Sequence, residues 1–336
     1  MKILVLGGTV FAGRHLVEAA ITAGHTVTMF NRGQTNPGLF PGVETIHGDR
    51  TVGLGALAGR RWDAAIDAAG YVPRVVRMSA EFLAAKVDHY TFVSSISVLA
   101  SFRERGMDES APVGRLQDAS TEEVTGDAYG PLKALCEVAA ETAMPGKTLI
   151  IRPGLIVGPD DPTDRFTYWP ARIARGGEIL APVGPECETQ LIDVRDLAEW
   201  TVRMIEAKGT GVFNATGPAT PLTLGEVFET CRAASGSDAK PVWVTEEFVT
   251  ELGILPWMEL PLWVGGGDEM AGFAAVNCQK AIAAGITFRP LAETVVATLD
   301  WDRQRASLPR KAGLSPEKEA AALAMWHARQ IEMEAL

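Results

Sequence analysis

The chain has 336 residues, 47% of them hydrophobic and 22% charged, with a formal net charge of −11. This length and apolar content predict a folded protein with one large domain or two interleaved ones, and they exclude a disordered chain. The acidic balance, without a lysine or arginine cluster, argues against a nucleic-acid partner. Apolar runs far shorter than ~20 residues argue against a membrane helix. Four cysteines without C-x-x-C spacing and an N-terminus without a signal-peptide pattern favour the cytoplasm.

Short apolar runs alternate with longer stretches of helical periodicity along the first two thirds of the chain. The runs are KILVL, TVTMF, DAAIDAA, YTFVSS, TLIIRP and GVFNA. Such alternation is typical of βαβ units, so we predict an α/β fold built on a Rossmann doubly wound parallel sheet, with a smaller, interleaved C-terminal substrate domain. The predicted boundaries are 1–155 with a return at about 189–216 for the Rossmann domain, 156–188 and 217–310 for the substrate domain, and 311–336 for a C-terminal helix.

The first turn, GGTVFAG at residues 7–13, lies between an apolar run and a helical pattern. In a Rossmann turn the first glycine allows a tight turn, the second lets the backbone approach the pyrophosphate, and the third allows close helix packing. Gly7 and Gly13 fit the first and third roles, whereas Val10 replaces the second glycine. A tight turn without a ligand is the alternative. If a dinucleotide binds, we expect its pyrophosphate at the helix N-terminus, against Gly8, Thr9, and the N–H groups of Phe11 and Ala12.

The second strand ends in Phe30-Asn31-Arg32-Gly33, where NAD-specific folds usually carry an acid that holds the ribose 2′-hydroxyl. Here Asn31 occupies that position and no acid is present. A planar guanidinium such as that of Arg32 suits a phosphate dianion. The pattern favours NADP over NAD, and a solvated loop arginine is the alternative.

The strongest chemical signal combines a strand that ends in hydroxyls, TFVSSISV at 91–98, with YGPLK at 129–133 near a helix start. Tyr129 and Lys133 are four residues apart and share one helical face. A nearby ammonium favours the phenolate and lowers the pKa of a tyrosine from its usual value near 10. A serine hydroxyl could hold a substrate oxygen while Tyr129 gives or takes its proton, as hydride transfer to a carbonyl requires.

Taken together, these motifs resemble the extended short-chain dehydrogenase/reductase family, the NAD-dependent epimerase/dehydratase group. The similarity continues through DES at 108–110, LIIRPGLIVGP, QLIDVRDLAEW and FRPLAETVVATLDW. GGTVFAG and FNRG are closest to an atypical branch that includes chloroplast stem-loop-binding proteins. The resemblance implies that Ser95 is the catalytic hydroxyl, Tyr129 the acid/base, and Lys133 the residue that binds ribose and tunes the tyrosine. The cofactor contacts that it implies further along the chain are Asp49 and Arg50 at the adenine, Ala68, Ala69 and Gly70 along the cofactor, and Pro153 near the nicotinamide.

Three functions remain open from the sequence. The first is an NAD(P)-dependent oxidoreductase acting on a small carbonyl or alcohol substrate, and the second is a nucleotide-sugar epimerase with tightly bound NAD. The third is a nucleotide-sensing or RNA-binding protein on the same fold. An epimerase needs basic groups for a pyrophosphate, for which Arg165, Arg172 and Arg175 are candidates, although each could equally be solvated. The weaker substrate-binding candidates are Ser97, Arg165, Tyr168 and Trp169, the last two of which could instead be core residues.

The five histidines lack metal-ligand spacing, so we predict no metal site. We expect a small-molecule substrate and no membrane partner. By resemblance to the extended family, a homodimer is possible.

Overall fold

The computed structural model describes residues 1–118, 120–305 and 309–334. The chain divides into two compact units, each described here by itself. Unit 1 comprises Met1–Ile156, Leu191–Ala219 and Val276–Phe288. Unit 2 comprises Val157–Gln190, Thr220–Ala275 and the described part of Arg289–Leu336. In the described residues no helix is both long and apolar enough to cross a membrane.

Unit 1 is built on a parallel sheet with the strand order β11-β6-β5-β4-β1-β2-β3. This order, in which the chain runs outward from β1 in both directions, confirms the predicted Rossmann α/β fold. The bounds of the strands are β1 (Lys2–Leu6), β2 (Thr26–Asn31), β3 (Glu44–His47), β4 (Ala64–Asp67), β5 (His89–Val93), β6 (Thr148–Pro153) and β11 (Gly211–Ala215).

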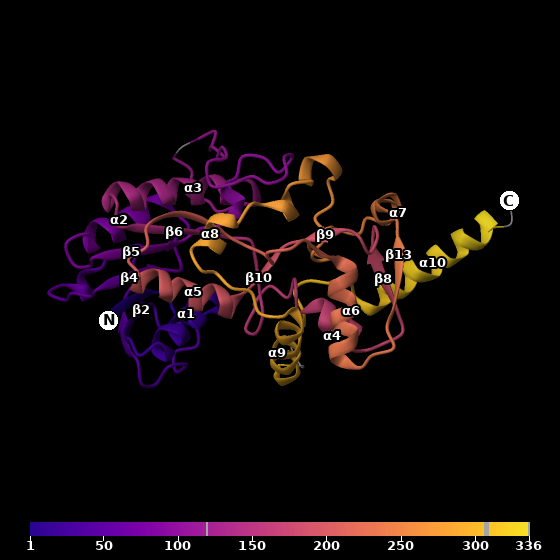
Figure 1. The fold of residues 1–336 in the computed structure, drawn as a ribbon, viewed down its shortest axis with the longest axis horizontal. Coiled ribbons are helices and arrows are strands. Elements are labelled where there is room, and N and C mark those ends of the chain that lie inside the picture. Colours follow the sequence, from indigo (N-terminus) through magenta and orange to yellow (C-terminus); the bar gives the residue numbers. More distant parts are fainter. Residues whose placement is uncertain (119, 306–308, 335–336) are drawn as a thin grey trace. The chain divides into compact units, whose positions relative to one another are not determined.

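Helices cover both faces of this sheet (Figure 1). Because side chains alternate along a strand, Ile3 and Val5 of β1 face one helical layer while Leu4 and Leu6 face the other. The layer against Ile3 consists of α1 (Phe11–Thr22) and α5 (Val194–Glu206), and the opposite layer of α2 (Pro73–Leu83) and α3 (Gly126–Ala143). Short 3₁₀ turns follow β3 and β5, namely η1 (Gly55–Leu57) and η2 (Ile96–Val98).

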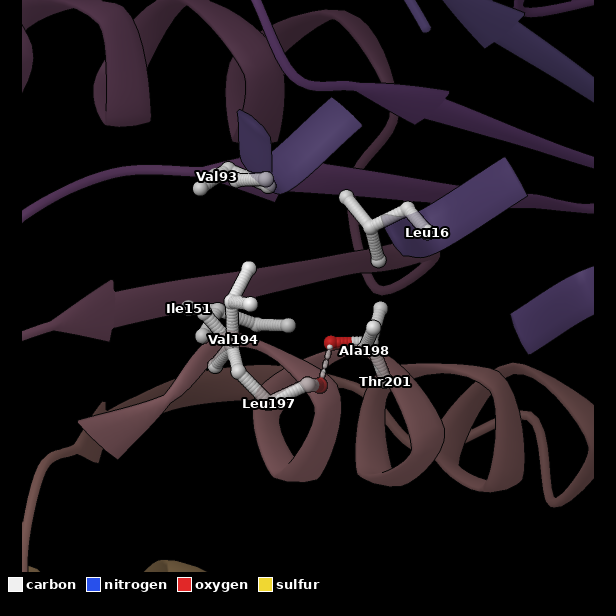
Figure 2. Close-up of a pocket in the computed structure, with 8 residues that line it drawn as sticks. Leu16, Val93, Ile151, Val194, Leu197, Ala198 and Thr201 are labelled. Atoms are coloured by element: carbon white, nitrogen blue, oxygen red, sulfur yellow. Dashed lines mark hydrogen bonds between the residues drawn. The ribbon is translucent and has the colours of Figure 1, made fainter. Parts of the chain in front are cut away.

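A small apolar cavity of about 10 Å³ lies in this core, lined by residues of α1, α5, β5 and β6 (Figure 2). Leu16, Val93, Ile151 and Leu197 are among the side chains around it. It is at most about the size of one water molecule, so it is a packing defect and not a ligand site.

The segment around α8 (Gln279–Ala283) returns to unit 1, although the sequence placed all of 217–310 in the second domain. Three hydrogen bonds account for this return, because they tie the segment to β11 and α5. Asn214 Nδ2 donates to Asn277 O (3.1 Å), Lys280 Nζ to Val212 O (2.7 Å), and Trp200 Nε1 to Ala284 O (3.1 Å). A two-stranded sheet pairs β7 (Leu155–Val157) with β10 (Leu191–Asp193).

Unit 2 has its own aromatic core. The ring of Phe228 lies 4.5 Å from that of Trp169 and 5.3 Å from that of Trp243. Its helices are α4 (Tyr168–Ile173), α6 (Leu224–Ser235), α7 (Glu246–Glu251), α9 (Leu291–Gln304) and α10 (Pro316–Glu334), with the 3₁₀ turns η3 (Gly267–Met270) and η4 (Phe273–Ala275). Its strands pair as β8 (Glu178–Pro182) with β13 (Lys240–Val244) and β9 (Glu188–Thr189) with β12 (Leu222–Thr223).

The C-terminal helix α10 belongs to the packing of unit 2. Trp326 contacts the ring of Phe248 at 4.8 Å, and Glu319 pairs with Arg172 of α4 at 2.6 Å. The amphipathic helix expected at this end of the chain is therefore integrated with α4, α7 and β8.

Candidate active site

The glycine turn after β1 keeps the steric features of a dinucleotide loop despite Val10. Gly7 and Gly8 have φ of +108° and +96°, a region that favours glycine. A Cβ on Gly13 would lie 3.0 Å from Gly8 N, so the third glycine allows α1 to approach the turn. Val10 is the extended N-cap residue of α1 and is 46% exposed. Its side chain therefore extends toward solvent and leaves the helix N-terminus accessible.

The end of β2 braces this turn through amide groups. Asn31 Nδ2 donates to Gly7 O (3.1 Å), and Asn31 Oδ1 accepts from Gly33 N (2.9 Å). In the following loop, Asn36 Nδ2 donates to Thr9 O (2.9 Å). Asn31, at the position that distinguishes NAD from NADP, thus holds the turn in place and brings no negative charge to it.

Arg32 is exposed, and within the described residues it has no hydrogen-bond or ion-pair partner. Its charge acts on Asp49 after β3, whose pKa is lowered mainly by hydrogen bonds from Thr51 and slightly by the Arg32 charge. Asp49 Oδ1 accepts from Thr51 N at 2.8 Å and from its hydroxyl at 2.6 Å. The Arg32 guanidinium is therefore available to an anion near the end of β2.

Arg50 occupies a different place from the one expected of it. Its guanidinium forms a bidentate ion pair with Asp67 at the end of β4, at 2.5 and 2.6 Å. Asp67 is fully buried and also accepts from the Tyr90 hydroxyl at 2.8 Å. Burial acts to raise the pKa of Asp67, but the Arg50 charge prevails and holds it below its usual range. The side chain of Arg50 is thus directed to Asp67, under the segment Ala68–Gly70, and only its backbone is left for the predicted adenine contact.

Ser95 begins the η2 turn directly after β5. Its hydroxyl accepts from Ser97 N and donates to Ser97 Oγ, both at 3.0 Å. The two serine side chains are therefore held side by side at the carboxyl end of β5, which is where ligands bind in open α/β sheets.

Helix α3 brings Tyr129 and Lys133 to the same edge of the sheet. Lys133 Nζ donates to Gly70 O (2.7 Å) and Val93 O (2.6 Å), which follow β4 and end β5. A Cβ on Gly130 would lie 2.0 Å from Ser97 O, so only glycine after Tyr129 permits this close approach to the serine turn. The start of α3 at Tyr129 and Gly130 therefore lies against the serine turn and Lys133 reaches the end of β5, although the serine turn ends more than 30 residues before Tyr129 in the sequence.

Lys133 is only 3% exposed, and burial lowers its pKa to about 8. It lacks a carboxylate at hydrogen-bond distance, since its two partners are carbonyl groups. Its charge state consequently changes within the pH range in which most enzymes work.

A buried ion pair links the elements that carry Ser95, Lys133 and Pro153. Arg152 donates to both carboxylate oxygens of Glu137 (2.9 and 2.7 Å), and Ser94 Oγ donates to Glu137 Oε1 (2.5 Å). Glu137 lies one helical turn after Lys133, Ser94 directly precedes Ser95, and Arg152 directly precedes Pro153. One carboxylate thus ties together α3, β5 and β6, the elements that present the predicted catalytic residues.

Comparisons with known proteins show the family to which the chain belongs. The model of the NAD dependent epimerase/dehydratase family matches residues 3–215, well over half of the chain. The chain belongs to this family. It is accordingly an NAD(P)-dependent enzyme of the short-chain dehydrogenase/reductase type. None of the curated proteins matches it.

Several solved structures share the fold of this epimerase/dehydratase family member at low identity. UDP-glucuronic acid 4-epimerase from Bacillus cereus, in complex with NAD, is 17% identical, with a TM-score of 0.65 over 90% of this chain and 99% of the other. UDP-glucose 4-epimerase from Thermotoga maritima, with UDP-glucose, is 18% identical, with a TM-score of 0.65 over 91% and 100%. A human epimerase family protein with NADPH is 20% identical, with a TM-score of 0.60 over 89% and 99%.

The residues present fit the nicotinamide dinucleotide of this family. Gly13 lets α1 pack closely against Gly8 in the glycine turn, and the accessible N-terminus of α1 at Val10 supplies N–H groups to an anion. The residues that would hold the dinucleotide are Gly7, Gly8, Thr9, Phe11, Ala12 and Gly13 in the turn, Asn31 and Arg32 after it, and Ala68, Ala69 and Gly70 after β4. Their contacts with a nucleotide remain predictions.

Two of the predicted substrate residues of this family member are core residues of unit 2. Tyr168 is 3% exposed, and Trp169 is fully buried with its Nε1 donating to Pro261 O at 2.6 Å. Packing, the alternative left open for both residues, is their role in this structure. Arg165 is half-buried, with its guanidinium 5.0 Å from the ring centre of Trp257.

Sequence reasoning missed Tyr71, Glu137 and Arg152. Glu137 could have been found as the next residue on the Tyr129 and Lys133 face, and Arg152 as a charge inside an apolar strand. Tyr71 carried no comparable signal, because its place beside α3 depends on the three-dimensional fold. Among the described residues no group of three or more His, Cys, Asp and Glu side chains could hold a metal ion, and the cysteines there are free.

Proposed function

We propose that this protein is an oxidoreductase that transfers hydride between a nicotinamide cofactor, preferably NADP, and a small carbonyl or alcohol substrate. The observation that carries the proposal is the convergence of the Ser95 turn with Tyr129 and Lys133 at the carboxyl end of the sheet. A proton donor, a hydroxyl that can orient an oxygen and a cation gather there. Those are the groups that carbonyl reduction needs from a protein.

In the proposed reaction each residue has a defined task. When bound, the nicotinamide supplies or accepts a hydride at the substrate carbon. Ser95 turns its one hydroxyl proton from Ser97 Oγ to the substrate oxygen and fixes the direction of that oxygen. In reduction Tyr129 gives its proton to that oxygen, so that the carbonyl becomes an alcohol, and it regains a proton from solvent. Below pH 8 the Lys133 ammonium, one helical turn away, stabilises the tyrosinate left behind.

Epimerisation of a nucleotide sugar is the second candidate, because the comparison structures include UDP-sugar 4-epimerases with NAD or UDP-glucose. The same residues would take a proton from a sugar hydroxyl and later return it. A diphosphate needs cations that are not already neutralised. Of the three arginines predicted for it, Arg172 pairs with Glu319, which counts against the epimerase, whereas Arg175 is exposed and can still receive an anion.

The test starts with the purified full-length protein, from which any retained nucleotide is released by denaturation and identified by mass. NADPH and NADH are then titrated by fluorescence, and a panel of aldehydes and ketones is offered with deuterium-labelled NADPH. For a reductase we expect exchangeable NADPH and deuterium on the product carbinol carbon. Retained NAD with interconversion of UDP-glucose and UDP-galactose would establish the epimerase instead.

Tyr129→Phe is the matched variant, because it removes one hydroxyl and keeps the ring. We expect it to bind NADPH as wild type does and to lose at least 100-fold in kcat. Full turnover by this variant, or a wild-type protein that binds neither NADPH nor NADH, would overturn the proposed function.

A further inference from the structure

Tyr71 is an exposed aromatic residue that lies against both of the converging residues of α3. Its ring centre is 5.3 Å from Lys133 Nζ and 6.5 Å from the ring centre of Tyr129. Yet 49% of Tyr71 is accessible, which is unusual for so large a side chain that lies next to a buried ammonium. The residue thus separates Lys133 from solvent while facing solvent itself.

The backbone on both sides of Tyr71 is held by specific contacts. Gly70 before it is held by Lys133 through the 2.7 Å hydrogen bond to its carbonyl, and a Cβ on Gly70 would lie 2.6 Å from the Phe92 ring. Val72 after it is extended (φ −121°, ψ 126°), as a residue before proline prefers, and Pro73 begins α2. Only Tyr71 separates these two fixed points.

The Lys133 ammonium lies near two aromatic rings. The ring centre of the fully buried Phe92 is 4.3 Å from Lys133 Nζ, and that of the half-exposed Tyr71 is 5.3 Å away. Both distances allow a cation–π attraction, which favours the charge, but burial is the larger influence on Lys133 and disfavours it. The charged and titratable groups that act on Lys133 from the surrounding elements are Asp67 of β4, Arg50 after β3, and Cys136 and Glu137 of α3.

We propose that Tyr71 is a positioning residue of the reaction site, which covers the Lys133 ammonium against water and packs beside the Tyr129 ring. Its removal admits water to Lys133, so the charged form of the lysine becomes easier to maintain. Burial raises the pKa of Tyr71 itself, so its phenol stays neutral while Lys133 titrates. The importance of Tyr71 for catalysis rests on the proposed function, because in the proposed reaction Lys133 acts on Tyr129.

The test follows the Lys133 side chain directly by NMR. Protein labelled with ¹³C at the lysine ε carbons is titrated from pH 6 to 11, and the Lys133 signal is assigned by its loss in Lys133→Met. We expect a midpoint near 8 in wild type and in the control Tyr71→Phe, which keeps the ring. In Tyr71→Ala we expect the midpoint to rise by about one pH unit, because desolvation is the main cause of the low value. Equal midpoints in Tyr71→Ala and Tyr71→Phe would overturn the proposal.

Circular dichroism and thermal unfolding show whether each variant folds. If Tyr71→Ala does not fold, Tyr71→Ser replaces it. This small and polar residue also admits water to Lys133, so a midpoint unchanged from wild type would again count against the role of Tyr71. The titration uses neither nucleotide nor substrate. A wild-type protein that fails to bind NADPH and NADH would therefore overturn the proposed function. The titration would still show whether Tyr71 covers Lys133.

Discussion

Lys133 is a buried cation whose hydrogen-bond acceptors are two backbone carbonyl groups, those of Gly70 and Val93. Carbonyl dipoles hold the ammonium in place without neutralising it, so burial still disfavours its charge and lowers its pKa to about 8. A lysine of this kind can keep its charge at neutral pH and lose it in mildly alkaline solution. At the scale of the single residue, this predicts a dependence of stability on pH.

The prediction compares wild type with Lys133→Met. Between pH 8 and the ordinary lysine pKa of 10.5, the unfolded chain binds a proton at Lys133 that the folded protein has lost. The free energy of unfolding of wild type therefore rises with pH in that window relative to the variant. From pH 7 to pH 10 we expect a relative gain of about 2 to 3 kcal/mol, measured by urea denaturation. A difference between the two proteins that stays constant with pH would contradict the low pKa of Lys133.

We propose that the choice between NADP and NAD also depends on single residues, those at the end of β2 and directly after it. Both polar atoms of the Asn31 amide bond the backbone, and Arg32 is exposed next to them. We expect Arg32→Ala to lower the affinity for NADPH about tenfold, the usual worth of one charge-assisted hydrogen bond, and to change that for NADH less than threefold. Fluorescence titration of both nucleotides measures this. Arg77→Ala, which removes an exposed arginine of α2, is the control, and equal losses for NADPH and NADH would rule out recognition of the 2′-phosphate by Arg32.

At the scale of the element, α3 is the part of the fold on which the candidate site depends. Tyr129, Lys133 and Glu137 follow one another at intervals of one turn, and each faces the edge of the sheet where β4, β5 and β6 end. Tyr129 lies beside the serine turn, Lys133 reaches Gly70 and Val93, and Glu137 pairs with Arg152. The orientation of this helix therefore sets the positions of Tyr129 and Lys133 relative to Ser95 on the serine turn.

A double-mutant cycle on the Glu137 and Arg152 pair tests this dependence. Either single change, Glu137→Leu or Arg152→Met, leaves an uncompensated charge in the core, so we expect each to cost about 3 to 5 kcal/mol of stability. The double variant leaves no buried charge and should be more stable than either single variant. Urea denaturation at pH 7 measures all four proteins. Additive losses in the double variant would show that the two side chains do not act as a pair.

Those parts of the candidate site that depend on residues close together in the sequence could be predicted from it. Helical periodicity places Tyr129 and Lys133 on one face, and the glycine turn is defined within seven residues. The ion pairs were not predictable in this way. Arg50 pairs with Asp67 across 17 positions, and Glu137 with Arg152 across 15, because strand order brings their elements together. The adenine contact of Arg50 was inferred from the family resemblance, and nothing local in the sequence indicated that its side chain pairs with the buried Asp67.

At the scale of the whole molecule, the chain passes between two units several times, and their boundaries follow long-range contacts. The return of residues 276–288 to unit 1 depends on hydrogen bonds from α8 and its flanks to β11 and α5, which no periodicity in the sequence reveals. Likewise α10 is packed into unit 2 through Glu319. Its carboxylate pairs with Arg172 and accepts from Leu180 N, so it joins α10 to α4 and β8.

Because each unit has its own core, we expect damage to the Glu319 contact to stay within unit 2. Glu319→Leu leaves the Arg172 guanidinium buried with only the carbonyls of Gly176 and Glu178 as partners. The loss of its carboxylate should destabilise α4, β8 and α10 by about 3 kcal/mol or more. Hydrogen exchange followed by mass spectrometry should then show faster exchange in those three elements and unchanged exchange in β1, β4 and β5.

Glu317→Ala is the matched control, since Glu317 is an exposed acid in the first turn of the same helix and its loss should leave exchange as in wild type. An equal acceleration in the central strands of unit 1 would mean that the two units unfold together. The stability of the candidate active site would then depend on α10 as much as on the sheet that carries it.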